Sequence, residues 1–146
     1  MPRPHILLVD NNLADVEAMR QAFIDYWPDA DLHVMWEGSQ AQAAFASQGG
    51  AHVAADLILL DLHLTSVHGR DLLALLKRNP AFRRIPVVVL TSTDDPVERD
   101  ACLAAGADRF ITKPRTFRAL APLLEGLRGL IADRVGTGPA GGDADG

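Results

Sequence analysis

The chain has 146 residues, of which 48% are hydrophobic and 23% are charged, and its formal net charge at pH 7 is −5. This length and composition predict one globular domain with a sizeable core. The acidic balance argues against unspecific nucleic-acid binding, which depends on clustered Lys and Arg, so we expect no direct DNA binding.

The only cysteine, Cys102, excludes an internal disulfide and is typical of a reducing compartment. No apolar segment is long enough to span a bilayer. The start, Met1–His5, is not followed by the long apolar run of a signal peptide. These features predict a cytoplasmic protein that makes no membrane contact.

The first apolar run, Ile6–Val9, ends at Asp10 and predicts a buried strand. Asn11–Asn12 makes the turn, and either Asn12 or Asp15 can cap the helix that follows. The apolar residues of this helix recur at helical spacing: Val16, Met19, Phe23 and Trp27.

The next unit begins with the alternating apolar residues Leu32, Val34 and Trp36, which predict a half-exposed edge strand. An Ala-rich helix is expected from Gln40 to Gln48, closed by Gly49–Gly50.

The central run, Leu57–Leu60, is uninterrupted and is followed by Asp61. Such a run is typical of a strand buried on both faces of a parallel sheet. A carboxylate just beyond its carboxyl end lies where open α/β sheets bind ligands. Alternatively, Asp61 only caps the next turn. A loop over 65–69 and a helix from Asp71 to Arg78 complete this unit.

Two further units follow. The β-branched run Ile85–Leu90 predicts a strand that ends at Thr91, and Asp94–Pro96 begins a helix that Gly106 ends. The last strand, Arg109–Thr112, leads directly into Lys113–Pro114.

The last helix is expected from about Phe117 to Ile131. Pro122 predicts either a kink or a late helix start, because proline removes a backbone hydrogen bond. Beyond it, residues 134–146 are dominated by Gly, Pro, Ala and Asp and are expected to form a disordered tail. We therefore assign residues 1–133 to the folded domain.

Strand–helix alternation repeated five times predicts an α/β fold with a parallel sheet and right-handed crossovers. Five strands and five helices suit the flavodoxin-like doubly wound sheet, with strand order 2-1-3-4-5.

Four polar residues end four of the predicted strands: Asp10, Asp61, Thr91 and Lys113. In the order 2-1-3-4-5 the two carboxylates meet at the crevice, where they repel unless a cation or proton lies between them. Oxygen ligands of this kind suit Mg²⁺. A Lys and a Thr opposite suit a phosphoryl group, so Asp61 can act as a nucleophile that forms an aspartyl phosphate.

At these residues the sequence resembles the receiver domain of bacterial two-component response regulators, from about His5 to Ile131. The matching motifs are Leu8–Asn12, Leu59–Leu62 with Gly69 further on, Val89–Ser92 and Ile111–Pro114. The resemblance implies a signalling switch and not an enzyme.

By this resemblance, Asp61 accepts a phosphoryl group from a histidine kinase, and Thr91 and Lys113 bind its oxygens. Phe110 takes the place of the aromatic switch residue. The resemblance also implies a cis Lys113–Pro114 peptide bond. The implied Mg²⁺ ligands are Asp10, Asn11, Asp61 and the backbone carbonyl of His63.

The stretch from Val87 to Asp95 and the lack of an output domain resemble the small stand-alone receivers that partner bacterial phytochrome kinases. A histidine kinase is therefore the expected partner, with a phytochrome-type photoreceptor as one candidate. We also expect a homodimer through the face of the fourth helix, the fifth strand and the last helix, where Leu123 and Leu130 lie beside the core stripe.

Three positions depart from the family pattern. Asn11 replaces a second acidic residue, Thr65 replaces a proline, and His63 replaces a smaller polar residue. Asn11 supports one alternative, a degenerate receiver that binds partners without phosphorylation. An aspartyl-phosphate phosphatase is the other alternative, but it needs a second Asp where His63 stands. A Zn²⁺ site at His63 and His68 is disfavoured against solvated loop histidines.

Overall fold

The computed structural model describes residues 3–48, 54–65 and 67–140. The strands are β1 (His5–Val9), β2 (Asp31–Met35), β3 (Leu57–Asp61), β4 (Val87–Thr91) and β5 (Arg109–Thr112). The helices are α1 (Leu13–Tyr26), α2 (Gly38–Ala46), α3 (Gly69–Arg78), α4 (Pro96–Ala104) and α5 (Leu120–Ala140).

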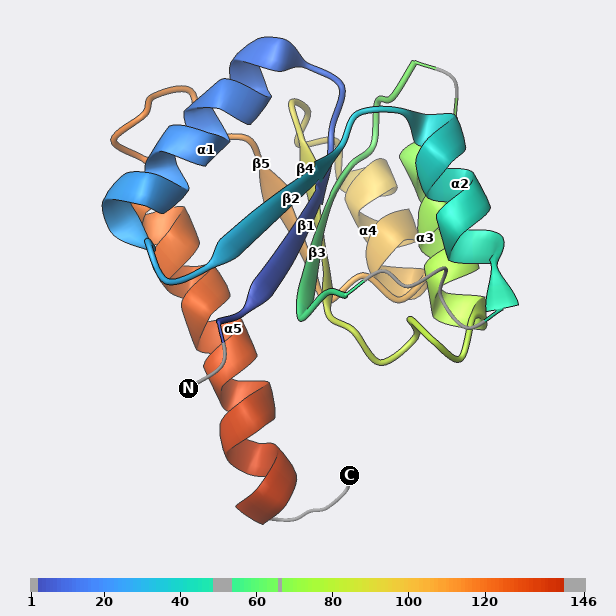
Figure 1. Ribbon diagram of the computed structural model, residues 1–146. Helices are drawn as coiled ribbons and strands as arrows, with labels where there is room; N and C mark the ends of the chain where they lie inside the picture. The colour runs from blue at the N-terminus through green and yellow to red at the C-terminus, as the bar shows by residue number, and fades with distance from the viewer. Residues whose placement is uncertain (1–2, 49–53, 66, 141–146) are drawn as a thin grey trace.

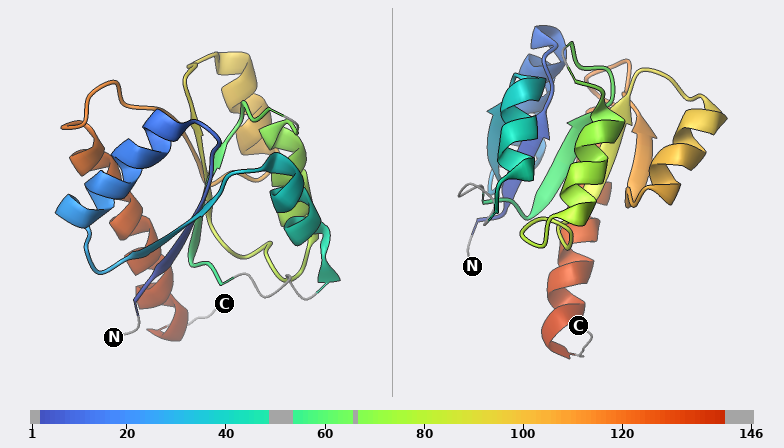
Figure 2. Two further views of the ribbon diagram at one scale, coloured as in Figure 1. Left: turned by 45° about the horizontal axis from the view of Figure 1, so that its top comes forward. Right: turned by 90° about the vertical axis from the view of Figure 1, so that its right-hand side faces the viewer.

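The strands form one sheet in the order β2-β1-β3-β4-β5, and every neighbouring pair is parallel. Helices α1 and α5 cover one face, while α2, α3 and α4 cover the other (Figure 1). The two turned views in Figure 2 show the same three layers. The predicted fold class and strand order are confirmed.

The central strands are buried along their whole length, because helices cover both of their faces. All five residues of β3 and all five of β4 are buried. Successive side chains of β3 point to opposite faces, so Leu59 packs with α1 and α5 while Leu60 packs with α2 and α3. Complete burial of one such Leu side chain is worth about 1.5–3 kcal/mol.

Both edge strands are partly exposed, as was expected for β2. No residue of β2 is fully buried, in keeping with its place at one end of the sheet. None of the four residues of β5 is buried either, and this strand closes the opposite end. Strand order therefore explains why these two sequences are more polar than the runs in β3 and β4.

Side chains define where two helices begin. The Asn12 side chain accepts a hydrogen bond from the Asp15 amide at 2.9 Å, so Asn12, and not Asp15, is the N-cap of α1. At the start of α4, Asp95 accepts from the amide of Val97 and Pro96 occupies the first turn, as predicted.

The largest boundary differences lie in α5. The helix starts late, at Leu120, so that Pro122 falls in the first turn, where backbone amides have no intrahelical acceptor. It also continues past the expected end at Ile131 to Ala140, into the segment expected to be a disordered tail. The last part of that tail, residues 141–146, lies outside the described residues. Smaller shifts of about two residues occur at the starts of α2, α3 and β4.

One backbone expectation is wrong. No peptide bond within the described residues is cis, so the Lys113–Pro114 bond is trans. The trans isomer is the lower-energy form even before proline. In this isomer the Lys113 ammonium still reaches the carboxylates at the end of the sheet.

Candidate functional site

The four polar residues that end the strands come together at one edge of the sheet. Asp10 follows β1, Asp61 and Thr91 are the last residues of β3 and β4, and Lys113 follows β5. Asp10 is 2% exposed, Asp61 5% and Thr91 0%, and they are the buried polar residues of the described chain. Buried polar groups are costly unless they are paired, which marks this edge as the candidate site.

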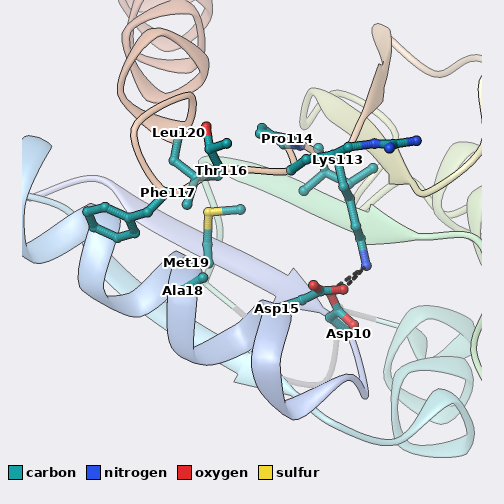
Figure 3. A pocket seen from close by; sticks show the side chains of 11 residues that line it. Asp10, Asp15, Ala18, Met19, Lys113, Pro114, Thr116, Phe117 and Leu120 are labelled. Carbon is teal, nitrogen blue, oxygen red and sulfur yellow. Dashed lines mark hydrogen bonds and ion pairs between the residues drawn. The ribbon is translucent and has the colours of Figure 1, made fainter.

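The Lys113 ammonium is the common partner of the carboxylates. Its Nζ lies 3.1 Å from Asp10 Oδ2 and 3.6 Å from Asp61 Oδ1. It lies nearer still, at 2.7 Å, to Asp15 Oδ2 on α1. In Figure 3, the Lys113 side chain reaches down from the loop after β5 toward Asp10 and Asp15. One cation therefore faces three carboxylates.

Burial dominates the protonation of Asp10. It raises the pKa of this carboxyl, and the nearby Asp61 charge raises it further. The Asn12 amide, which donates to Asp10 Oδ1 at 3.0 Å, and the Lys113 ammonium both oppose this rise without cancelling it. Ionised Asp10 is thus incompletely compensated within the chain, as is typical of a site that accepts a further cation.

Opposing effects act on Lys113. Burial lowers the pKa of its ammonium, but the hydrogen bond to Asp15 and the charges of Asp10 and Asp61 outweigh burial, so the pKa is raised. Lys113 is therefore charged at neutral pH and can bind anionic oxygens.

Other predicted site residues lie around these groups. The His63 amide donates to Asp61 Oδ1 at 3.3 Å, which places the His63 backbone beside that carboxylate. Thr91 Oγ1 accepts from the Thr93 amide at 3.3 Å. Phe110 is half-buried on β5, where it pairs with Val89 and packs against the core under α2 and α3.

The Asn11 side chain is held by a hydrogen bond to the loop after β3. Its amide nitrogen donates a hydrogen bond to Thr65 Oγ1, which leaves its amide oxygen as the atom that could bind a cation.

The donor set fits a hard metal ion better than a zinc ion. No cluster of three or more His, Cys, Asp or Glu side chains able to hold a metal occurs in the described parts of the chain. The proposed set has two carboxylates, one amide oxygen and one main-chain carbonyl, which are Asp10, Asp61, Asn11 and His63. Such all-oxygen sets suit Mg²⁺, which keeps several of its waters.

The histidines beside the site have a different partner. His63 Nε2 lies 3.6 Å from Glu98 Oε1, and His68 Nε2 lies 3.9 Å from Glu98 Oε2. The His63 and His68 side chains are 50% and 44% exposed, so they remain solvated. This arrangement agrees with the preference for loop histidines over a Zn²⁺ site.

Asp15 is the site residue that the sequence did not assign. The sequence indicated only a capping role for it, and its contact with Lys113 joins residues 98 positions apart. Its acidic place in the first turn of α1, next to the strand end at Asp10, is the one signal that could have suggested it.

The fold and this edge define a class of protein, the receiver domains of two-component signalling. The family model of the response regulator receiver domain matches residues 6–125, so the chain belongs to that family.

Among curated proteins, the chain is similar to the response regulator Rcp1 of Synechocystis sp., with 32% identity over 92% of each chain. Among solved structures, it is similar to the phosphorylated cyanobacterial phytochrome response regulator RcpA, with 29% identity and a TM-score of 0.76; the match covers 86% of this chain and 91% of that one. The Mn²⁺-bound form of Rcp1 has 31% identity and a TM-score of 0.73, with the same coverage.

In the described part of the chain, no helix combines the length and the hydropathy that crossing a membrane requires.

Proposed function

We propose that this protein is a phosphorylation switch in which Asp61 accepts a phosphoryl group from a histidine kinase. The observation that carries the proposal is the position of Asp61, buried at the end of the central strand with the Lys113 ammonium 3.6 Å from its Oδ1. A nucleophilic carboxylate beside a fixed cation is the arrangement that phosphoryl transfer needs.

In the proposed reaction, an Asp61 oxygen attacks the phosphorus of a phosphohistidine. The phosphorus–nitrogen bond breaks, an oxygen–phosphorus bond forms, and the released imidazole takes up a proton. Lys113 neutralises the phosphoryl oxygens, and the Thr91 hydroxyl donates a hydrogen bond to one of them. Thr91 moving toward the phosphoryl group leaves space into which Phe110 rotates, which alters the surface around β5.

Mg²⁺ would be held by Asp10, Asn11, Asp61 and the His63 carbonyl, and it would supply positive charge to the transferred group. The oxygen-only donors of this chain support that ion. The Mn²⁺-bound form of Rcp1 supports a divalent metal in a related chain.

The proposed partner is a histidine kinase, with a phytochrome-type photoreceptor as the candidate. The likeness to Rcp1 and to the phytochrome response regulator RcpA supports this class of partner. The proposed output is a change in a surface that binds another protein. Direct DNA binding is not expected, since the chain is acidic. The cytoplasmic location expected from the lone cysteine stays a prediction.

A degenerate receiver is the second candidate, and the neutral Asn11, hydrogen-bonded to Thr65, is the observation that favours it. A phosphatase has less support, because His63 stands where its second Asp is needed.

Incubation with acetyl phosphate and Mg²⁺, followed by intact-mass spectrometry, separates these functions. A switch gains one labile phosphate at Asp61, a phosphatase turns the reagent over, and a degenerate receiver does neither. Asp61→Asn should abolish the modification while leaving circular dichroism unchanged. Asp71→Asn, at an exposed carboxylate on α3, is the control that should still be modified. Label on another aspartate in Asp61→Asn would contradict the assignment.

A further inference from the structure

The shortest contact of the Lys113 ammonium is with Asp15 and not with Asp61. Nζ lies 2.7 Å from Asp15 Oδ2, whereas Asp61 Oδ1 at 3.6 Å is beyond ordinary hydrogen-bond distance. We propose that Asp15 is a positioning residue that holds Lys113 in its resting orientation and competes with the phosphoryl group for it. The second half of this inference rests on the proposed function above.

The local structure of α1 places Asp15 for this contact. Asn12 caps the helix by accepting the Asp15 amide, so Asp15 is the third residue of its first turn. From there its carboxylate reaches across to the loop after β5. Asp15 and Lys113 lie at one end of a cavity of about 170 Å³ between α1 and the start of α5, whose apolar wall includes Met19, Phe117 and Leu120 (Figure 3).

Exposure distinguishes the partners of Lys113. The Asp10 side chain is 2% exposed, so its contact cannot be replaced by water without a large cost. The Asp15 side chain is 41% exposed, so water can replace Lys113 there at a small cost. Asp15 is therefore the partner that Lys113 gives up when it moves toward a new anion.

Phosphorylation creates this new anion. Before phosphorylation, Asp61 is the carboxylate farthest from the Lys113 ammonium. A phosphoryl group on Asp61 adds further charged oxygens there. Lys113 approaches those oxygens by shifting away from Asp15. The Asp15 contact thus stabilises the unphosphorylated state and lowers the affinity of the site for a phosphoryl group.

Stabilisation of the α1 N-terminus is a simpler role for Asp15, since acidic residues are favourable in a first turn. Asp71 offers a matched control for it. Asp71 is the third residue of α3, is also an aspartate in a first turn, and is exposed to solvent. Asp71→Asn removes an equivalent charge from the first turn of α3 and leaves the contact between Asp15 and Lys113 intact.

The first test measures the contact in the unphosphorylated protein. Asp15→Asn should shift the Lys113 Nζ resonance in ¹⁵N NMR of lysine-labelled protein and speed the exchange of its protons with water. Asp71→Asn should leave that resonance unchanged. Asp15→Glu keeps a carboxylate, so its Lys113 resonance should lie between those of the original protein and Asp15→Asn. An unchanged Lys113 resonance in Asp15→Asn overturns the positioning role, whatever the fate of the proposed function.

The second test measures the competition by calorimetric titration with beryllofluoride, a phosphoryl mimic, in the presence of Mg²⁺. Because the contact is partly exposed, Asp15→Asn should bind the mimic more tightly by up to about fivefold. Asp71→Asn should bind like the original protein. Equal or weaker binding in Asp15→Asn overturns the competition alone. Absence of binding to the original protein overturns both the competition and the proposed function.

Discussion

The Asn11 amide nitrogen donates a hydrogen bond to Thr65 Oγ1, joining the turn after β1 to the loop after β3. Both residues are among the expected departures from the receiver pattern, and they lie 54 positions apart in the sequence. An acidic residue at position 11 could not donate this bond, and a proline at position 65 could not accept it through a side chain. The two departures therefore form one structural unit at the edge of the site.

Asn11→Asp should tighten Mg²⁺ binding by about tenfold, the equivalent of ~1.4 kcal/mol, because the variant brings a full charge to the ligand set. It should also lower the melting temperature of the metal-free protein. A further carboxylate would join a site in which burial and the charge of Asp61 already raise the pKa of Asp10. Calorimetric titration of Mg²⁺ and thermal melts without metal measure the two effects.

Thr65→Val is the control for this variant, since it removes the hydrogen bond and keeps the charge of the site. Its Mg²⁺ affinity should change far less than that of Asn11→Asp. Equal Mg²⁺ affinities in Asn11→Asp and the original protein would show that residue 11 is not a metal ligand of consequence.

Gly69 is required by close packing against the end of β3. A Cβ at this position would lie 2.5 Å from Leu62 Cα and 2.6 Å from the Asp61 carbonyl oxygen, both of them backbone atoms. Gly69→Ala should therefore lower the free energy of unfolding by roughly 1–3 kcal/mol, as overpacking does. Urea denaturation, monitored by tryptophan fluorescence, gives the value.

Gly129→Ala provides the comparison, because a Cβ there meets nothing within 4 Å and the residue lies inside α5. It should raise the free energy of unfolding by up to about 1 kcal/mol, through helix propensity. Similar changes in the two variants would contradict the packing argument.

The sequence predicted the part of the site that depends on strand ends. Asp10, Asp61, Thr91 and Lys113 each follow or end an apolar run, and parallel strands bring such ends to one edge. The apolar runs therefore predicted these four positions, whereas the strand order came from the flavodoxin-like fold that five strand–helix units suit.

The parts that the sequence did not predict depend on the angle between packed elements. Asp15 reaches Lys113 only because α1 lies beside the loop after β5, and no local pattern encodes that approach.

Pro122 predicts either a kink or a late start of α5, and the structure has the late start; the extension to Ala140 goes beyond the predicted end at Ile131. Gly and Pro have low helix propensity, and Pro139 has no backbone N–H to donate a helical hydrogen bond, so the sequence pattern does not account for this extension.

Cys102 should be chemically silent in the folded protein. The residue is 0% exposed, and burial, with a further contribution from Glu98, raises the pKa of its thiol. Since the thiolate is the nucleophile, iodoacetamide should label the folded protein far more slowly than the urea-unfolded protein at pH 8. Comparable labelling rates in the two states would contradict the burial of this side chain.

The raised pKa of Cys102 has a consequence for stability. The folded state keeps the thiol proton to higher pH than the unfolded state does, so its contribution is present at neutral pH. It is lost as the pH rises through the alkaline range in which a free thiol ionises. Cys102→Ala should therefore show a smaller alkaline loss of unfolding free energy in urea titrations at several pH values.

The expected homodimer should form through α4, β5 and α5, and the more exposed apolar residues of this face lie on α4. Leu123 and Leu130 are half-buried against the core beneath α1 and α5. On α4, in contrast, Val97 is 77% exposed and Leu103 is 38% exposed, and β5 is an edge strand. Exposed apolar side chains beside an open sheet edge favour association with a second copy.

Val97→Glu should therefore weaken dimerisation, because the dimer would bury a charge at its interface. Leu13→Glu makes the same change at an equally apolar side chain on α1, which is 65% exposed and lies on the opposite side of the sheet. It should leave the dimer intact. Light scattering over a range of concentrations, with and without acetyl phosphate and Mg²⁺, measures the mass. A monomer at high concentration under both conditions would contradict the dimer. Equal weakening by the two variants would contradict this face, because α4 and not α1 is expected to lie in the interface.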